Sequence, residues 1–457
     1  MNSGWYFTSE WDLVPVRRGD ALGFRAGADY FAELLAPGLS NSTFDARWIT
    51  LLSWCLKWSH VAWKNAGGKD LSRRDDQRAR YAWLRPLELL WVVRALRAGQ
   101  DTGQLRGSRS IKRWFKANEQ SPNFAMSPDQ FRRYRQVGTY GAYRVVFRTV
   151  SGLTEGGDGW TPSSVAHRLA EIANDGLPHA ARLLDEHFEQ RIQWGSWSGG
   201  NEARYWLERG WPTSRTIIGG LQPTADAATR ELLPEKERHL LESVLFSAGS
   251  TRRITAEVLA QAKSASSHGD LCDALANSSL LLTTLGPGSL VPLPAFSRFA
   301  DAAMDAMRAL WSEINHDDDQ QAPALNRLSN SVELGSRLDK LRKESYTWLN
   351  TAARNDFPHQ RVITRLAEAM CGAKTPIGQL RVLVRHHHEH GGGRRWFREQ
   401  SGTLVPLVAD TGIAASDYRF RLQSLSRLAA QCGVANMNKA LDALAQHGSS
   451  DEEGDVL

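Results

Sequence analysis

The sequence lacks the signatures of several protein classes, and each absence narrows what the chain can be. Cysteine is scarce and no CxxC pair occurs, so a disulfide framework and a cysteine zinc site are both disfavoured. No run reaches the roughly 18 apolar residues that a membrane-spanning helix needs. The N-terminus has no basic segment followed by an apolar run, as a signal peptide requires. We therefore expect a cytoplasmic protein with no membrane partner. The four cysteines are Cys55, Cys272, Cys371 and Cys432.

Motifs for nucleotide binding and catalysis are also missing. The sequence contains no GxGxxG, no GxxxxGK[ST], no GxSxG and no set of kinase motifs. The GGGRRWF segment at 391–397 leads into a predicted strand and not into a helix N-terminus, so it does not fit a phosphate-binding loop. We expect no cofactor. These absences favour a non-catalytic protein and leave an enzyme open.

The composition is that of a folded protein. The chain has 457 residues, of which 42% are apolar and 23% charged, near the values of globular proteins. A chain of this length can bury a large core and corresponds to two or three domains. Many of its 17 tryptophans fall within apolar helical runs, which favours core side chains over exposed stacking platforms. The net charge of +6 permits an acidic partner without requiring one.

Hydrophobic periodicity predicts a mainly α, multi-helical fold with a small C-terminal β-hairpin. A short helix over 29–35 ends before a Pro-Gly pair. Helices over 44–63 and 81–99 are apolar on most sides and should pack together as an N-terminal core. Near the C-terminus, a helix over 378–390 precedes a hairpin and an amphipathic helix. This order is compatible with a winged-helix arrangement and equally with a helical domain that carries a small hairpin.

Shifts in composition suggest domain boundaries. We expect an N-terminal helical domain over 1–152 that contains a basic segment, and a central helical domain over 160–371. A helix–hairpin–helix unit would follow over 372–450, and residues 451–457 would form an acidic tail. The glycine-rich stretch 154–162 is interpreted as a linker or long loop.

The strongest functional signal is the basic segment 106–148, in which aromatic residues are interleaved with lysine and arginine. Cationic side chains neutralise phosphates, and aromatic rings provide surfaces on which bases stack. In RSIKRWFK the basic residues lie three or four positions apart and form one stripe on a helix, with Trp114 and Phe115 partly on the other side. A solvated basic face over an aromatic core is the alternative interpretation. The predicted nucleic-acid-binding residues are Arg109, Lys112, Arg113, Lys116, Arg132, Arg133, Arg135 and Arg144.

The most conspicuous local pattern is the histidine run HHHEH at 386–390. His386 and His390 lie four positions apart, so they can share a helix face and hold a metal ion. HEXXH is absent, however, and spacing indicates no third ligand. The main expectation is therefore no metal site, with the run forming a polar helix end where imidazolium would suit the helix dipole. A metal-dependent nuclease that uses His386 and His390 is an alternative.

Two segments resemble a known family. The first starts at Asp20, Leu22 and Gly23 and continues into the pattern L-x-P-G-x-S-x-x-T-x-x-x-R-aromatic. That pattern is formed by Leu35, Pro37, Gly38, Ser40, Thr43, Arg47 and Trp48. Together with HHHEHGGGRRWF…YRFRLQSLSRLA near the C-terminus, it resembles an uncharacterised prokaryotic family encoded among restriction and antiphage-defence genes. The resemblance covers only these two parts of the chain. It implies a bacterial accessory protein of a defence locus and carries no catalytic residue over.

These patterns together predict a nucleic-acid-associated, non-catalytic subunit or adaptor of a bacterial antiphage-defence or DNA-processing system. The expected partners are nucleic acid, with DNA favoured over RNA, and other subunits of a defence complex. A metal-dependent nuclease is one alternative. A protein–protein interaction scaffold built on the tryptophan-rich helices is the other.

Overall fold

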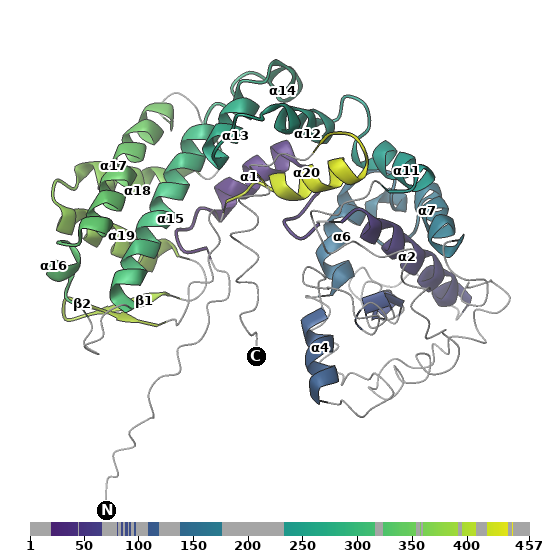
Figure 1. Ribbon diagram of the computed structural model, residues 1–457, viewed down its shortest axis with the longest axis horizontal. Coiled ribbons are helices and arrows are strands. Elements are labelled where there is room, and N and C mark those ends of the chain that lie inside the picture. Colours follow the sequence, from purple (N-terminus) through teal and green to yellow (C-terminus); the bar gives the residue numbers. More distant parts are fainter. Residues whose placement is uncertain are drawn as a thin grey trace, which may run out of the picture. The chain divides into compact units, whose positions relative to one another are not determined.

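The fold is mainly helical, as the sequence predicts. In the part of the chain that the computed structural model describes, the strands form one two-stranded antiparallel sheet near the C-terminus (Figure 1). The described residues are 20–43, 45–65, 108–117, 138–175, 233–315, 323–352, 360–391, 395–407 and 418–436, with short pieces between 80 and 96 and residues 357 and 441. Contacts divide the chain into two compact units, each made of segments far apart in sequence. The expected domain boundaries at 152, 371 and 450 stay predictions.

Unit 1 comprises Met1–Leu35, Val258–Phe420 and Asn438–Leu457. Its long helix α15 packs against both α13 and α17, and α17 packs against α18. Alanine occupies much of the buried surface of α15, which lets neighbouring helices approach closely. The described helices of unit 1 are α1 (Arg25–Leu35), α13 (His268–Ala276), α14 (Ser279–Leu285), α15 (Leu293–Asn315), α16 (Leu325–Leu328), α17 (Val332–Ala352), α18 (Gln360–Gly372) and α19 (Pro376–His390).

Aromatic rings join the distant segments of unit 1. Phe296 of α15 lies 5.5 Å from Phe31 of α1 and 5.8 Å from Phe420, between ring centroids. Phe31, Phe296 and Phe420 are at most 2% exposed. Burying three phenylalanines in mutual contact contributes several kcal/mol, at about 1.5–3 kcal/mol for each side chain. This cluster fixes α1 and residue 420 onto α15.

The predicted C-terminal hairpin is present. Strand β1 (Phe397–Gln400) pairs with β2 (Thr403–Pro406), with Phe397 opposite Pro406. Ser401 and Gly402 both have positive φ, as a two-residue turn of this hand requires. Leu404 N–H also donates to Pro323 O at 3.1 Å, which ties the hairpin to the segment before α16. A winged-helix arrangement stays a prediction.

Unit 2 comprises Ala36–Glu257 and Arg421–Met437, and the boundary between the units falls within α12 (Thr251–Gln261). Its central pair is α2 and α7. The helix expected over 44–63 is confirmed as α2. Trp91, in the predicted 81–99 helix, is helical and lies 5.7 Å from Trp54 of α2 between ring centroids. The described elements of unit 2 are α2 (Arg47–Asn65), α4 (Ser108–Ala117), α6 (Thr139–Thr149), η1 (Glu155–Gly157), α7 (Ser164–Asp175), α11 (Glu235–Leu245) and α20 (Leu422–Gln431).

Most of the described tryptophans are core side chains, as expected. They are no more than 4% exposed, so their area stabilises helix packing and is not available to a partner. The buried tryptophans are Trp48, Trp54, Trp58, Trp63, Trp91, Trp160, Trp348 and Trp396. Among the described helices, none has the length and apolar character to cross a bilayer.

Candidate nucleic-acid interface

Helix α4 carries the basic stripe that RSIKRWFK predicts. Ile111 and Ser108 are buried and anchor one side of the helix. The exposed side carries Lys112, Arg113 and Lys116. The lysine heads stay in water because burying an unpaired charge costs far more than one short helix can supply. The arrangement presents cations one helical turn apart, which suits successive phosphates.

The aromatic residues of α4 lie between the core and the solvent. Trp114 and Phe115 are half-buried, and their ring centroids are 5.6 Å apart in an edge-to-face arrangement. The two rings are neighbours on one helix, and each is only partly exposed, so they offer a stacked base less surface than fully exposed rings would. Phosphate contact is the main chemistry that α4 supports.

The remaining predicted binding residues divide into two groups. Arg109 belongs to α4, but its side chain lies outside the described part of the structure, as do Arg132, Arg133 and Arg135. Arg144 of α6 is half-buried, and its guanidinium carbon lies 5.6 Å from the centre of the Trp160 ring. That position stacks the cation on the core of unit 2 and leaves less of it for a phosphate than the exposed lysines of α4 offer.

Two tyrosines of the basic segment serve the interior of unit 2. Tyr140 is fully buried, its hydroxyl donates to Gly159 O, and its backbone N–H donates to Glu88 Oε1 at 2.9 Å. Burial raises the pKa of the Tyr140 hydroxyl well above its usual range, so it stays a hydrogen-bond donor. The hydroxyl of Tyr143 bridges the backbone N–H and O of Asp45, at 2.9 Å each. These rings are structural and not stacking platforms.

The histidine run forms the end of α19, but His386 and His387 are buried, so the expected imidazolium is wrong for these two residues. His386 Nε2 donates to Leu22 O at 2.9 Å, and His387 Nδ1 donates to Ala21 O at 2.8 Å. His387 Nε2 accepts the N–H of Trp396 at 3.1 Å. Burial lowers the pKa of both imidazoles to about 4, so both are neutral at pH 7. Neutral histidine can satisfy several backbone groups at once, and here it joins the end of α19 to residues 21–22 and 396.

The alternative metal site finds no support in this geometry. The rings of His386 and His390 lie 4.8 Å apart, but Nε2 of His386 is occupied by Leu22 O. Within the described ranges, no three His, Cys, Asp or Glu side chains gather as metal ligands. A zinc site needs three or four such ligands.

The two resembling segments meet in unit 1. The carboxylate of Asp20 accepts the N–H groups of Phe24 and Arg25, which caps the start of α1, and also accepts the hydroxyl of Tyr418 at 3.0 Å. Gly23 has φ +74°, and a Cβ there would lie 2.8 Å from His390 O. The pattern therefore has a structural explanation at these positions, since it positions the backbone between α1 and α19.

The L-x-P-G-x-S-x-x-T run has a similar role at the entrance to α2. Gly38 has φ +73°, and a Cβ there would lie 2.4 Å from Thr149 Oγ1. Ser40 and Thr43 share a hydrogen bond between their hydroxyls at 2.8 Å. Arg47 lies 3.6 Å from the buried Glu237 carboxylate. These contacts stabilise the turn that precedes α2, and they have a structural explanation that needs no catalytic role.

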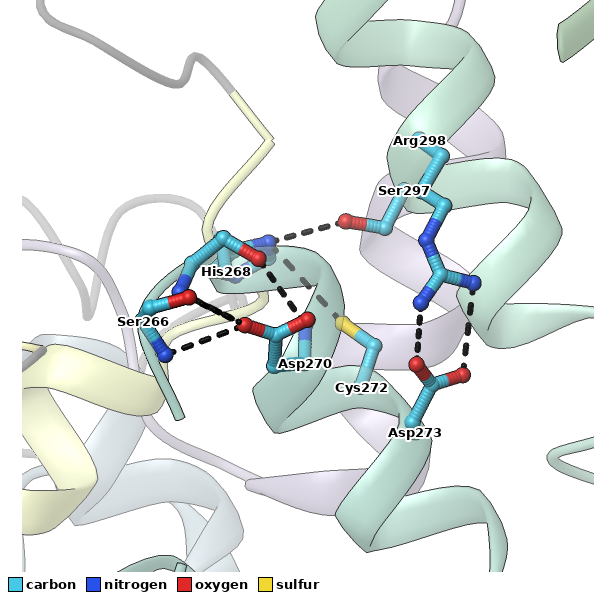
Figure 2. Close-up of polar contacts among 8 residues, drawn as sticks. Ser266, His268, Asp270, Cys272, Asp273, Ser297 and Arg298 are labelled. Carbon is cyan, nitrogen blue, oxygen red and sulfur yellow. Dashed lines mark hydrogen bonds and ion pairs between the residues drawn. The ribbon is translucent and has the colours of Figure 1, made fainter. Parts of the chain in front are cut away.

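A buried thiol–imidazole–hydroxyl cluster was missed by the sequence analysis, although His268 and Cys272 have the i, i+4 spacing that could have indicated it. His268 Nδ1 lies 2.9 Å from Ser297 Oγ and 3.8 Å from Cys272 Sγ (Figure 2). All three residues are at most 3% exposed. Burial raises the pKa of the Cys272 thiol well above its usual range and lowers that of His268 to about 4. A neutral pair with no access to solvent is not an activated nucleophile.

Polar contacts around this cluster hold α13 in place. Ser267 and Asp270 form a capping box at the start of α13, and Ser266 also bonds the Asp270 carboxylate. Asp273 pairs with Arg298 of α15 (Figure 2). The cluster is therefore best explained as a set of structural contacts that packs α13 against α15.

Comparison with known protein families, with curated proteins and with solved structures finds no match to this chain. Of the described candidates, α4 alone combines the expected residue types with exposure.

Proposed function

We propose that this protein is a nucleic-acid-associated, non-catalytic subunit or adaptor of a bacterial antiphage-defence or DNA-processing system, acting in the cytoplasm. The observation that carries the proposal is the exposed stripe of Lys112, Arg113 and Lys116 on α4. The buried Ile111 supports it, because an anchored helix holds its cations at fixed spacing and so loses less entropy on binding.

The defence-system part of the proposal depends on the family resemblance at the two segments. DNA stays the favoured ligand over RNA, and the binding experiment compares the two directly. Phosphate contacts alone carry no base sequence information, so the expected binding is strong at low salt and largely independent of sequence. Specificity would come from the other subunits of the complex.

Binding of labelled DNA and RNA across a salt series tests this proposal. We expect wild-type protein to bind duplex DNA with a steep salt dependence. In the variant Lys112→Gln/Lys116→Gln, the slope of log K against log salt should become shallower by about 1.8, since each phosphate contact on duplex DNA contributes about 0.9. Circular dichroism should show unchanged helix content.

The matched control removes two exposed lysines elsewhere, in Lys236→Gln/Lys263→Gln. This control has the same net charge as the α4 variant, so it should keep the wild-type slope if α4 is the contact surface. If the two variants have equal effects, the binding depends on overall charge and not on α4. Unchanged binding in a folded α4 variant would rule out α4 as the contact surface. Cleavage of the DNA in parallel samples with Mg²⁺ would favour the nuclease alternative instead.

A further inference from the structure

A second cationic surface lies in unit 2, on the α2–α7 pair. Lys57, His60 and Lys64 occupy positions i, i+3 and i+7 of α2, and therefore form one stripe along the helix. His167 of α7 lies beside this stripe, because it is one helical turn before Glu171, whose carboxylate lies 3.9 Å from Lys57 Nζ. We call these four residues the α2–α7 cationic face. Lys64 is exposed, and Lys57 and the two histidines are half-buried.

Indole rings hold the cations of this face in position. Lys57 Nζ lies 5.2 Å from the Trp58 ring centroid, and Lys64 Nζ lies 4.8 Å from that of Trp63. The guanidinium carbon of Arg80 lies 3.4 Å from the Trp63 centroid. Each cation–π contact stabilises one side-chain position by about 0.5–1 kcal/mol at an exposed site. Lysines held in this way lose less conformational entropy when an anion binds.

The hydrogen bonding of His60 leaves a donor for a ligand. Arg80 Nη1 donates to His60 Nδ1 at 2.8 Å, so the imidazole is neutral and carries its proton on Nε2. Burial, followed by the charges of Arg80, Lys64 and His167, lowers the pKa of His60 to about 4. Burial and Lys57 also lower the pKa of His167. Both imidazoles thus lie in a region of positive potential.

Among the residues that the structure describes, three carboxylates lie near this surface and compensate its positive charge only in part. Glu171 lies 3.9 Å from Lys57 and is 62% exposed, so that ion pair is weak. The Asp158 carboxylate accepts hydrogen bonds from the backbone N–H groups of Trp160 and Thr161, at 2.6 and 2.8 Å. Its negative charge is therefore partly compensated within its own loop. Glu155 is the smallest of the influences on the pKa of His167.

We propose that the α2–α7 cationic face is a binding site for a phosphate group, with Lys57 and Lys64 as the charged contacts and the two imidazoles as hydrogen-bond donors. A phosphate there would neutralise the lysines and favour protonation of both histidines. The phosphate can belong to a nucleic-acid backbone or to a small phosphorylated molecule. The first source rests on the proposed function, whereas the site itself does not.

The test is NMR of the full chain carrying ¹³C-labelled histidine, with the signals of His60 and His167 assigned from His60→Gln and His167→Gln. The pH titration is recorded alone, with inorganic phosphate, and with a 20-nucleotide DNA. Bound phosphate should raise both titration midpoints by about 1 pH unit, as an opposite charge within ~4–6 Å does. In Lys57→Gln/Lys64→Gln, phosphate should bind about tenfold more weakly, as expected for the loss of two partly exposed ion pairs.

Matched variants separate this site from α4. Lys236→Gln/Lys263→Gln removes the same two charges elsewhere and should respond as the wild type does. Lys112→Gln/Lys116→Gln should weaken DNA binding and leave the response to inorganic phosphate intact. That pattern keeps the two proposals independent, because either can fail while the other holds.

Each outcome decides the proposal. A response to both ligands, or to DNA alone, supports the site and a nucleic-acid source. A response to inorganic phosphate alone supports the site and assigns it to a small phosphorylated molecule. The proposal is overturned if neither ligand shifts the histidines, or if the shifts persist unchanged in Lys57→Gln/Lys64→Gln.

Discussion

The basic stripe of α4 and the histidine run of α19 are both conspicuous in the sequence, but they differ in how far their side chains are exposed to solvent. Lys112 and Lys116 are exposed, whereas His386 and His387 are 6% and 1% exposed. Lysine keeps its charge and therefore stays in water. Histidine loses its charge near neutral pH, and can then be buried if its ring nitrogens find partners. A cluster of one residue type thus predicts exposure only when the charge cannot be removed.

The largest effect that this comparison predicts is a loss of folding stability at acidic pH. In the folded chain the pKa values of His386 and His387 are about 4, against an ordinary 6.5. The unfolded chain therefore binds more protons between these values, so stability is full above pH 6.5 and falls as the pH approaches 4. Within that window, each histidine should lower the free energy of unfolding by about 1.4 kcal/mol for every pH unit by which the pH falls. Urea unfolding between pH 7 and 4.5 measures this loss.

The variants His386→Gln and His387→Gln sharpen the test, because glutamine keeps a donor and does not titrate. Each should flatten the pH dependence relative to the wild type. A wild-type free energy of unfolding that stays constant from pH 7 to pH 4.5 would contradict the buried, neutral assignment.

A smaller effect is expected when the ring of His387 is removed at pH 7. His387→Ala leaves Ala21 O and the N–H of Trp396 without their partner, and both lie in the interior. Loss of these bonds in a buried site should lower the free energy of unfolding by about 2–4 kcal/mol. Urea unfolding followed by circular dichroism gives the value. A loss below about 0.5 kcal/mol would show that the ring is not the link between α19 and residue 396.

The smallest effect should come from α4. Lys112→Ala and Lys116→Ala remove exposed side chains from a helix and replace them with the best helix former, so each should change stability by less than about 0.5 kcal/mol. The same unfolding measurement applies. A destabilisation of about 2 kcal/mol or more, the size expected of a buried contact, would mean that these lysines are structural. The expected difference from His387 would then not exist.

Local patterns predicted the elements well where a single helix or hairpin decides the outcome. The helix of 44–63 and the hairpin after Trp396 are both present, because apolar periodicity and turn residues act over a few positions. The helix expected at 29–35 starts earlier, at Arg25, because Asp20 caps it. Asp20 lies five positions before Arg25, so a sequence rule that looks for a cap directly before the helix does not identify it.

The candidate surfaces were harder to foresee. The stripe of α4 was visible because all its members are charged and adjacent. The α2–α7 cationic face was hidden within a run that reads as apolar, since Trp58 and Trp63 dominate the pattern around Lys57 and Lys64. Of the buried cluster, His268 and Cys272 share one helix, but Ser297 comes from α15, so no local window contains all three residues.

The sequence by itself determined the helical class, the hairpin, the scarcity of cysteine and the exposed charge of α4, because each depends on residue type and short-range spacing. Only the tertiary structure decided which segments share a unit: residues 20–35 join the chain from 258 to 420, and residues 421–437 join the chain from 36 to 257. It also decided that His387 is neutral and buried. Those outcomes depend on contacts between residues hundreds of positions apart, such as Ala21 O with His387, and such contacts leave no periodicity in either segment.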